Sequence, residues 1–183
     1  MQISEAVFAE KRHIMIYGIG CDLCDTARMA KSLGGPHGST FAARVFGPAE
    51  REALGLSEGN SSPLSAHKAA SAAADFAAKE AFLKAAGTGL AGPFALCEIE
   101  AVRLESGAPE YRFSGGSAQW MDEHHLRAKL SLSHDGGMAL AFCTLEQLPF
   151  IDPRPGAPSA KEDFKPAVGR LSYTRSPGEA RDR

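Results

Sequence analysis

The sequence has few cysteines and no long apolar run. Four cysteines among 183 residues are too few for the disulfide framework of a small secreted domain. No apolar stretch approaches the roughly 20 residues that a membrane helix needs, and the first twenty residues are too charged for the apolar centre of a signal peptide. We therefore expect reduced thiols, no membrane partner and a cytoplasmic protein.

A surplus of positive charge is also missing. The formal net charge is -2, which argues against a nucleic acid partner because such proteins need a broad positive surface. Hydrophobic residues make up 44% and charged residues 23%, as in ordinary globular domains. The length suits a single domain. We place it at residues 15–146, after an N-terminal extension (1–14) and before an extended tail (147–183) that holds six of the eleven prolines and is expected to be flexible.

The apolar spacing predicts an α+β domain with a mainly antiparallel sheet packed on a long helix. Residues 14–19 read as a strand buried on both faces. The order that follows is helices at 22–33, 40–46, 48–54 and 63–86, strands at 98–104 and 111–113, a helix at 117–129, and strands at 130–134 and 138–145. For the long helix we expect Ser62 as the N-cap and Gly87 as the terminating residue.

One carboxylate, Glu80, falls on the apolar stripe of the long helix. Phe76 and Leu83 lie four residues before it and three after it, and Lys84 follows at the next turn. A buried carboxylate needs a compensating cation, which can be a lysine, a metal ion or both. The alternative is an ordinary Glu80–Lys84 helix pair on a solvated edge.

A second carboxylate, Asp22, follows the first strand and two glycines. We expect its side chain to emerge at the strand end, and an aspartate there is also a good N-cap for the next helix. Two carboxylates and a lysine suit a Mg²⁺ ion that takes its other oxygens from water and a substrate phosphate. Zinc would need a histidine or cysteine cluster, which the sequence does not supply.

Five blocks of the chain resemble the holo-acyl-carrier-protein synthases, in that family's order and spacing. The blocks are residues 15–22 (MIYGIGCD), Arg28, residues 44–50 (RVFGPAE), residues 76–89 (FAAKEAFLKAAGTG) and residues 130–135 (LSLSHD). The resemblance implies the 4′-phosphopantetheinyl transferase fold and a Mg²⁺-dependent enzyme of lipid metabolism. Such an enzyme moves the phosphopantetheine arm of coenzyme A onto a serine of apo acyl carrier protein and releases adenosine 3′,5′-bisphosphate. Which carrier it serves, fatty-acid or polyketide, stays open.

The resemblance also implies roles for individual residues. Asp22 and Glu80 would hold Mg²⁺, and Lys84 would contact the phosphates and protonate the leaving group. Arg28, with Lys31 on the same helix face, would bind the acidic carrier. The coenzyme A site would be lined by Gly87, Thr88, Gly89, His134 and Lys84. The family's trimers place the active site between subunits, so Glu80 and His134 of one cleft would come from different chains of a homotrimer.

One position departs from the family. Members usually have an arginine where this chain has Asp75, so a phosphate contact is lost or is supplied by another cation, such as Lys68 or Arg44. A catalytically inactive, carrier-binding homologue is therefore a third alternative.

Other motifs suggest different chemistry. Cys21 and Cys24 form a Cys-x-x-Cys at a predicted strand-to-helix junction, so a thiol–disulfide redox protein is the second hypothesis. Residues 87–92 match Gly-x-Gly-x-x-Gly but follow a helix instead of a strand, which favours a cap and loop. His124 and His125 are adjacent and point in different directions, which favours a solvated helix face over a shared metal.

Overall fold

The computed structural model describes residues 14–56, 64–89 and 92–148. The elements are β1 (Met15–Asp25), α1 (Thr26–Gly34), α2 (Gly38–Val45), α3 (Pro48–Leu54), α4 (Ala66–Ala86), the 3-10 turn η2 (Leu96–Glu98), β2 (Ile99–Arg103), β3 (Pro109–Phe113), α5 (Gly115–Glu123), β4 (Leu126–Asp135) and β5 (Met138–Gln147). This order confirms the expected succession of strand, helices, two strands, helix and two strands.

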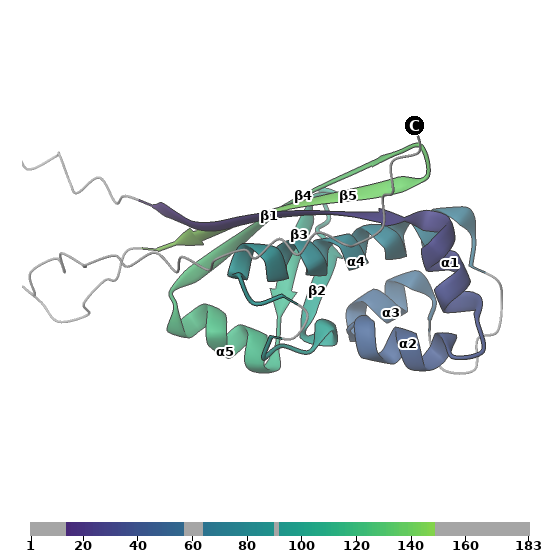
Figure 1. Ribbon diagram of the computed structural model, residues 1–183, viewed down its shortest axis with the longest axis horizontal. Helices are drawn as coiled ribbons and strands as arrows, with labels where there is room; N and C mark the ends of the chain where they lie inside the picture. The colour runs from purple at the N-terminus through teal and green to yellow at the C-terminus, as the bar shows by residue number, and fades with distance from the viewer. Residues whose placement is uncertain (1–13, 57–63, 90–91, 149–183) are drawn as a thin grey trace, which may run out of the picture.

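The long helix α4 forms the middle layer of the domain (Figure 1). On one side lies a three-stranded antiparallel sheet in the order β1-β5-β4. On the other side lie the antiparallel β2–β3 pair and α5, while α1, α2 and α3 cluster at one end of the molecule. The α+β class and the packing of the sheet on a long helix are as the sequence predicts.

Two glycines allow β1 and α4 to approach closely. A Cβ on Gly18 would collide with the carbonyl oxygen of Ala85, and a Cβ on Gly20 would collide with that of Ala81 and lie 2.9 Å from the Cβ of Lys84. Any larger residue would therefore push the strand away from the helix. The glycines of the first block thus bring the neighbouring Asp22 against the helix that carries Glu80 and Lys84.

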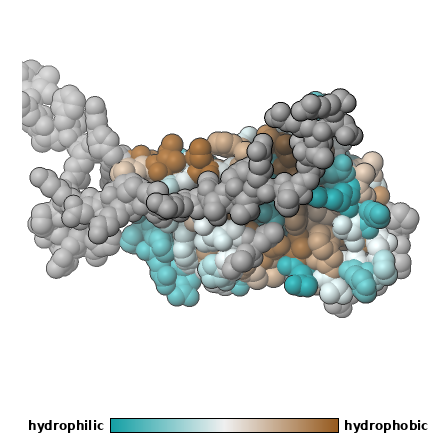
Figure 2. All heavy atoms as spheres, viewed as in Figure 1, coloured by the Kyte–Doolittle hydropathy of each residue, from teal (hydrophilic) through white to brown (hydrophobic). Residues whose placement is uncertain are grey.

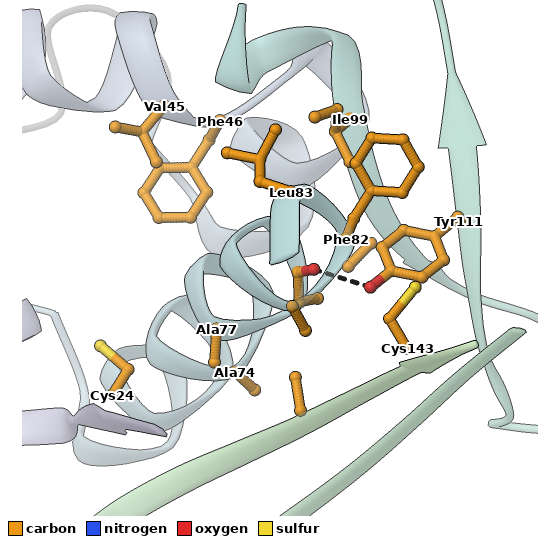
Figure 3. Packing of buried hydrophobic residues seen from close by; sticks show 14 of the residues in the cluster. Cys24, Val45, Phe46, Ala74, Ala77, Phe82, Leu83, Ile99, Tyr111 and Cys143 are labelled. Carbon is orange, nitrogen blue, oxygen red and sulfur yellow. Dashed lines mark hydrogen bonds between the residues drawn. The ribbon is translucent and has the colours of Figure 1, made fainter. Parts of the chain in front are cut away.

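The helix is buried around most of its circumference because many of its side chains are alanines, which let both neighbouring layers pack closely. Figure 3 shows Phe82 of α4 next to Tyr111 of β3, whose hydroxyl donates a 2.6 Å hydrogen bond to the Ala78 carbonyl. Lys79 and Glu50 form a fully buried ion pair of 2.7 Å that joins α4 to α3. These contacts fix the rotation of α4, and with it the direction of Glu80.

The first strand is longer than the sequence suggested. β1 runs to Asp25 because its backbone pairs with β5 as far as Asp25 and Met138. Asp22 therefore lies within the strand and is not the N-cap of α1. That role belongs to Asp25, whose Oδ1 accepts a 2.7 Å hydrogen bond from the Arg28 N–H.

The burial of β1 on both faces was a wrong prediction for the single chain. One face packs on α4, but on the other Ile19 and Leu23 are 60% and 54% exposed. The apolar run predicted a strand with both faces buried. Within one chain, α4 buries only one of these faces.

Two helix boundaries also differ from prediction. The helix expected at 117–129 ends at Glu123, because His125 takes a left-handed conformation (φ 51°) and β4 begins at Leu126. The long helix begins at Ala66, with Ser65 as its N-cap, while Ser62 and Pro63 lie outside the described residues. Gln147 belongs to β5, and the tail from 149 onward and the extension at 1–13 lie outside the described residues as well.

Candidate active site

Asp22 and Lys84 join the first strand to the long helix. The Lys84 Nζ donates a 2.9 Å hydrogen bond to Asp22 Oδ1 and another of 2.9 Å to the carbonyl oxygen of Cys21. The bond to Asp22 raises the pKa of Lys84, so the ammonium stays charged at neutral pH. The lysine expected to pair with Glu80 thus bonds to the other carboxylate of the predicted metal pair.

Glu80 lies within electrostatic reach of both residues. Its pKa is raised, first by burial and second by the negative charge of Asp22, and Lys84 opposes this shift. A solvated Glu80–Lys84 helix pair is therefore not what forms. Two like charges, those of Asp22 and Glu80, act on each other beside a single lysine, and this arrangement leaves unbalanced negative charge there.

Asp22 and Glu80 suit a hard divalent cation. Among the described residues no group of three or more His, Cys, Asp or Glu side chains could hold a metal. Mg²⁺, however, is commonly bound by only one or two carboxylates and keeps several waters or phosphate oxygens as ligands. A dication between Asp22 and Glu80 would relieve the repulsion that raises the pKa of Glu80.

The loop after α4 begins one turn beyond Lys84. Gly87 and Gly89 both have left-handed backbones, with φ of 73° and 62°, and Gly87 closes the helix as its C-cap. The Gly-x-Gly-x-x-Gly match is therefore a helix C-cap and loop. Between the glycines, the buried Oγ1 of Thr88 has no hydrogen-bond partner in the described part of the chain. Such a hydroxyl is available to a ligand that approaches the end of α4.

His134 is exposed near the end of β4. Burial raises the pKa of Asp75, and the charges of Arg103, Lys79 and His134 oppose that shift. Asp75 and Glu80 are five residues apart on α4, which places them roughly 140° apart around the helix axis. Within one chain, the charges that act on Glu80 are those of Asp22 and Lys84, whereas the charge of His134 acts on Asp75.

The predicted carrier-binding residues lie on α1, directly after β1. Arg28 and Lys31 are exposed, while Met29 between them is 4% exposed and packs in the core. The helix thus presents positive charge outward and apolar atoms inward.

Asp75 has an arginine partner that the sequence did not reveal. Its carboxylate is 7% exposed and lies 3.0 Å from the guanidinium of Arg103 on β2. Arg103 and Arg112 were not singled out because each is one of several charged residues on short alternating strands. Lys68 and Arg44 were the two cations expected to replace the family's arginine. Lys68 and Arg103 line one cavity between α3, α4 and the β2–β3 pair, whereas Arg44 is exposed on α2 and does not line it.

The redox hypothesis does not survive the geometry. Cys21 and Cys24 both lie within β1, where residues three apart point to opposite faces. Cys21 is exposed, and Cys24 is fully buried with a pKa raised by that burial. A thioredoxin-like pair needs both thiols at a helix N-terminus, so this Cys-x-x-Cys has no such role.

The solvated helix face predicted for His124 and His125 is correct for only one of the two residues. His124 is half-buried against Trp120, with ring centroids 4.5 Å apart, so the expected solvated face was wrong for this residue. His125 is exposed. Trp120 and Met121 pack in the domain core.

Comparison with known families agrees with this geometry. Residues 18–143 match the family model described as the 4′-phosphopantetheinyl transferase superfamily. At 41% identity over 140 residues, the chain is similar to a holo-[acyl-carrier-protein] synthase from Methylobacterium radiotolerans, with 74% of this chain and 96% of that protein covered. The chain belongs to the holo-[acyl-carrier-protein] synthase family.

Solved structures of that family share the fold. The crystal structure of the Neisseria meningitidis holo-[acyl-carrier-protein] synthase has a TM-score of 0.59 at 33% identity, covering 73% of this chain and 100% of that one. A Bacillus anthracis holo-(acyl-carrier-protein) synthase, solved in complex with CoA (3′,5′-ADP), has a TM-score of 0.56 at 28% identity, with 74% and 99% covered. No helix among the described residues of this chain is long and apolar enough to cross a bilayer.

Proposed function

We propose that the protein transfers the 4′-phosphopantetheine group of coenzyme A to a serine of apo acyl carrier protein. The observation that carries the proposal is that Lys84 bonds to Asp22 and that both lie within electrostatic reach of Glu80, on a chain of this family. The serine Oγ attacks the phosphorus attached to the pantetheine arm, and the bond from that phosphorus to the bridging oxygen breaks. The products are holo carrier and adenosine 3′,5′-bisphosphate.

The chain's own residues supply charge balance and alignment for this step. Lys84, held by Asp22, points an ammonium at the diphosphate and donates a proton to the departing phosphate oxygen. Glu80 accepts the proton of the serine hydroxyl. Asp22 and Glu80 would hold Mg²⁺, which neutralises phosphate charge when bound. Thr88, Gly87 and Gly89 line the coenzyme A side, where the buried, unpaired Thr88 hydroxyl donates to the ligand.

The carrier docks on α1. Acyl carrier proteins are acidic, and the chain as a whole is slightly negative, so attraction must come from a local basic surface. Arg28 and Lys31 on the exposed side of α1 supply it. Because α1 follows β1 directly, a carrier on this helix lies near the strand that bears Asp22.

The active assembly is a homotrimer with clefts between copies. Supporting this are the exposed apolar side chains on the outer face of the β1–β5 pair, where Leu23 lies opposite Leu140 and Cys21 opposite Phe142. Figure 2 shows hydrophobic surface over the first part of β1 as well. A patch of this kind on a soluble protein marks an interface. A second copy there would also let His134 of one chain serve the Glu80 cleft of another.

The test is incubation with coenzyme A, Mg²⁺ and apo acyl carrier protein, followed by mass spectrometry of the carrier. We expect a mass increase equal to one phosphopantetheine group, together with stoichiometric release of adenosine 3′,5′-bisphosphate. Carrier whose acceptor serine is replaced by alanine should gain no mass. Binding of carrier and coenzyme A without any transfer would instead support the inactive, carrier-binding homologue.

A further inference from the structure

The buried ion pair between Glu50 on α3 and Lys79 on α4 has a complete set of hydrogen bonds. The Lys79 Nζ donates to both carboxylate oxygens of Glu50, at 2.7 Å each, and to the carbonyl oxygen of Ile99 on β2. These three bonds use every N–H of the ammonium. Glu50 also accepts hydrogen bonds from the backbone N–H groups of Gly47, at 2.8 Å, and Ala101, at 2.9 Å. The pair therefore ties α4 to both α3 and β2.

Stability alone does not account for an ion pair at this depth. Neither side chain has any exposed surface, and the removal of two charges from water offsets much of their mutual attraction. An apolar pair of similar volume often gives equal or greater stability. What the hydrogen bonds add is direction, because they weaken steeply when their geometry changes, whereas apolar burial is non-directional. The network thus restricts rotation and sliding of α4 more tightly than apolar contacts can.

The residue after Lys79 on the helix is Glu80. Successive helix residues point about 100° apart, so Lys79 faces α3 and β2 while Glu80 shares another side with Lys84, which bonds to Asp22. On the side of β1, Gly20 has no side chain that could interlock with the helix. The direction of the Glu80 carboxylate therefore depends on the anchor at Lys79.

We propose that Glu50 and Lys79 are positioning residues for the divalent ion, because they hold α4 at the rotation that lets Glu80 share the ion with Asp22. The inference rests on the proposed function, which assigns the ion to these two carboxylates. Because both side chains of the pair are fully buried, neither reaches the ion or the donor, and both act through the backbone of α4. A misplacement of about 1 Å that originates far from the chemistry is enough to lose most of the rate.

The test removes the charges of the pair and keeps the volume of its side chains. Glu50→Gln combined with Lys79→Met leaves neither charge buried without a partner. We expect this double variant to keep a thermal unfolding midpoint close to that of the wild type. In the presence of adenosine 3′,5′-bisphosphate it should bind Mn²⁺ about tenfold more weakly, as loss of a group that orients a ligand predicts. For carrier loading, kcat should fall and KM for the carrier should stay unchanged. Ion affinity and kcat equal to those of the wild type would overturn the proposal.

Glu50→Gln alone is the milder variant and decides the question if the double variant does not fold. The amide has the shape of the carboxylate and keeps one oxygen as an acceptor for Lys79. We expect a folded protein whose affinity for Mn²⁺ lies below that of the wild type. A folded Glu50→Gln chain that binds the ion as tightly as the wild type would refute the role of the pair.

Two controls separate positioning from loss of stability. Met121 on α5 is 5% exposed and uncharged, so Met121→Ala should lower the unfolding midpoint and leave ion affinity unchanged. Arg127→Met with Glu146→Gln removes an ion pair of the same length, 2.7 Å, from a more exposed place on the sheet, and should leave ion affinity and kcat unchanged. If Met121→Ala weakens ion binding as much as the double variant does, the effect is one of stability and the positioning role is refuted.

Failure of this inference is distinguishable from failure of the proposed function. Ion binding is measured without transfer, so a wild-type chain that binds Mn²⁺ but does not load the carrier refutes the transfer proposal and still tests the pair. Carrier loading by the wild type, with the same rate and ion affinity in the double variant, refutes the pair alone. A wild-type chain that loads the carrier but binds no ion refutes the metal assignment, and with it the role of the pair.

Discussion

The Nζ of Lys84 lies 2.9 Å from Oδ1 of Asp22, which joins α4 to β1 across 62 positions of sequence. The bond forms because two glycines in β1 leave no side chain between strand and helix. It places the Lys84 ammonium beside Asp22, one of the two carboxylates that we propose hold the metal. The predictions below test this arrangement and its consequences.

Gly20→Ala should damage both stability and the site. The added methyl group would collide with the backbone of Ala81 and with Lys84, and overpacking of this kind typically costs about 1–3 kcal/mol. The strand must also shift, which moves Asp22 away from Lys84. Chemical denaturation and transfer rates check both effects. Gly34→Ala is the control, since nothing lies within 4 Å of a Cβ there, and it should not lower stability. An unperturbed Gly20→Ala would contradict the close approach.

Charge reversal on α1 should weaken the carrier interaction. Arg28→Glu together with Lys31→Glu should raise KM for the carrier about tenfold at low salt, with a smaller effect at high salt, and should leave KM for coenzyme A unchanged. Steady-state kinetics at two ionic strengths measure this. An unchanged KM for the carrier at low salt would place its docking surface elsewhere.

Interruption of the outer face of β1 should dissociate the assembly. Leu23→Lys puts a charge on a side chain that is 54% exposed in the single chain, so the monomer should fold normally. Sedimentation or light scattering should show a monomer, with loss of transfer because each cleft needs two chains. Mixing Glu80→Gln chains with His134→Ala chains should recover part of the activity, since some clefts then combine wild-type residues. A Leu23→Lys variant that remains oligomeric, or a mixture with no recovery, would contradict shared clefts.

The cysteines should react in order of exposure. Cys21 is exposed and should be modified first by a thiol reagent at pH 8, whereas Cys24 and Cys143 should react only after unfolding. Mass spectrometry after oxidation should show no bond between Cys21 and Cys24. Formation of that disulfide in the native protein would revive the redox hypothesis.

Alkaline pH should destabilise the fold through Cys143. Burial raises the pKa of its thiol from 9.0 to about 12. The folded state therefore keeps a proton that the unfolded chain releases, so this contribution is fully present below pH 9 and is lost as pH rises toward 12. The slope for one such group is at most about 1.4 kcal/mol per pH unit. Urea unfolding of the wild type and of Cys143→Ala should show a shallower pH dependence in the variant, and parallel curves would contradict this effect.

Much of the fold could be predicted because its elements have local signals. Gly87 ends α4 where a left-handed residue is needed, and the pair Gly136-Gly137 turns β4 into β5. What failed were boundaries that depend on tertiary pairing. The spacing of Leu23 and Ala27 imitates a helix, but β5 holds residues 22–25 in the sheet.

The site was predictable in part, because some of its residues also have local signals in the sequence. Glu80 and Asp22 stood out because a carboxylate beside apolar residues or after a glycine-rich strand is unusual, and helix spacing identified Lys84. The Asp75–Arg103 pair was not predictable, since it joins α4 to β2 across 28 residues without a motif. The effect of the His134 charge on Asp75 likewise emerges only from the packing.

The most direct test of the account is titration of the protein with Mn²⁺ or Mg²⁺ in the presence of adenosine 3′,5′-bisphosphate, followed by calorimetry or electron paramagnetic resonance. We predict one divalent ion per cleft in the wild type. Asp22→Asn and Glu80→Gln should each weaken its binding at least about tenfold while the thermal unfolding midpoint stays close to that of the wild type. Unchanged ion affinity in both variants would show that these two carboxylates do not hold the metal.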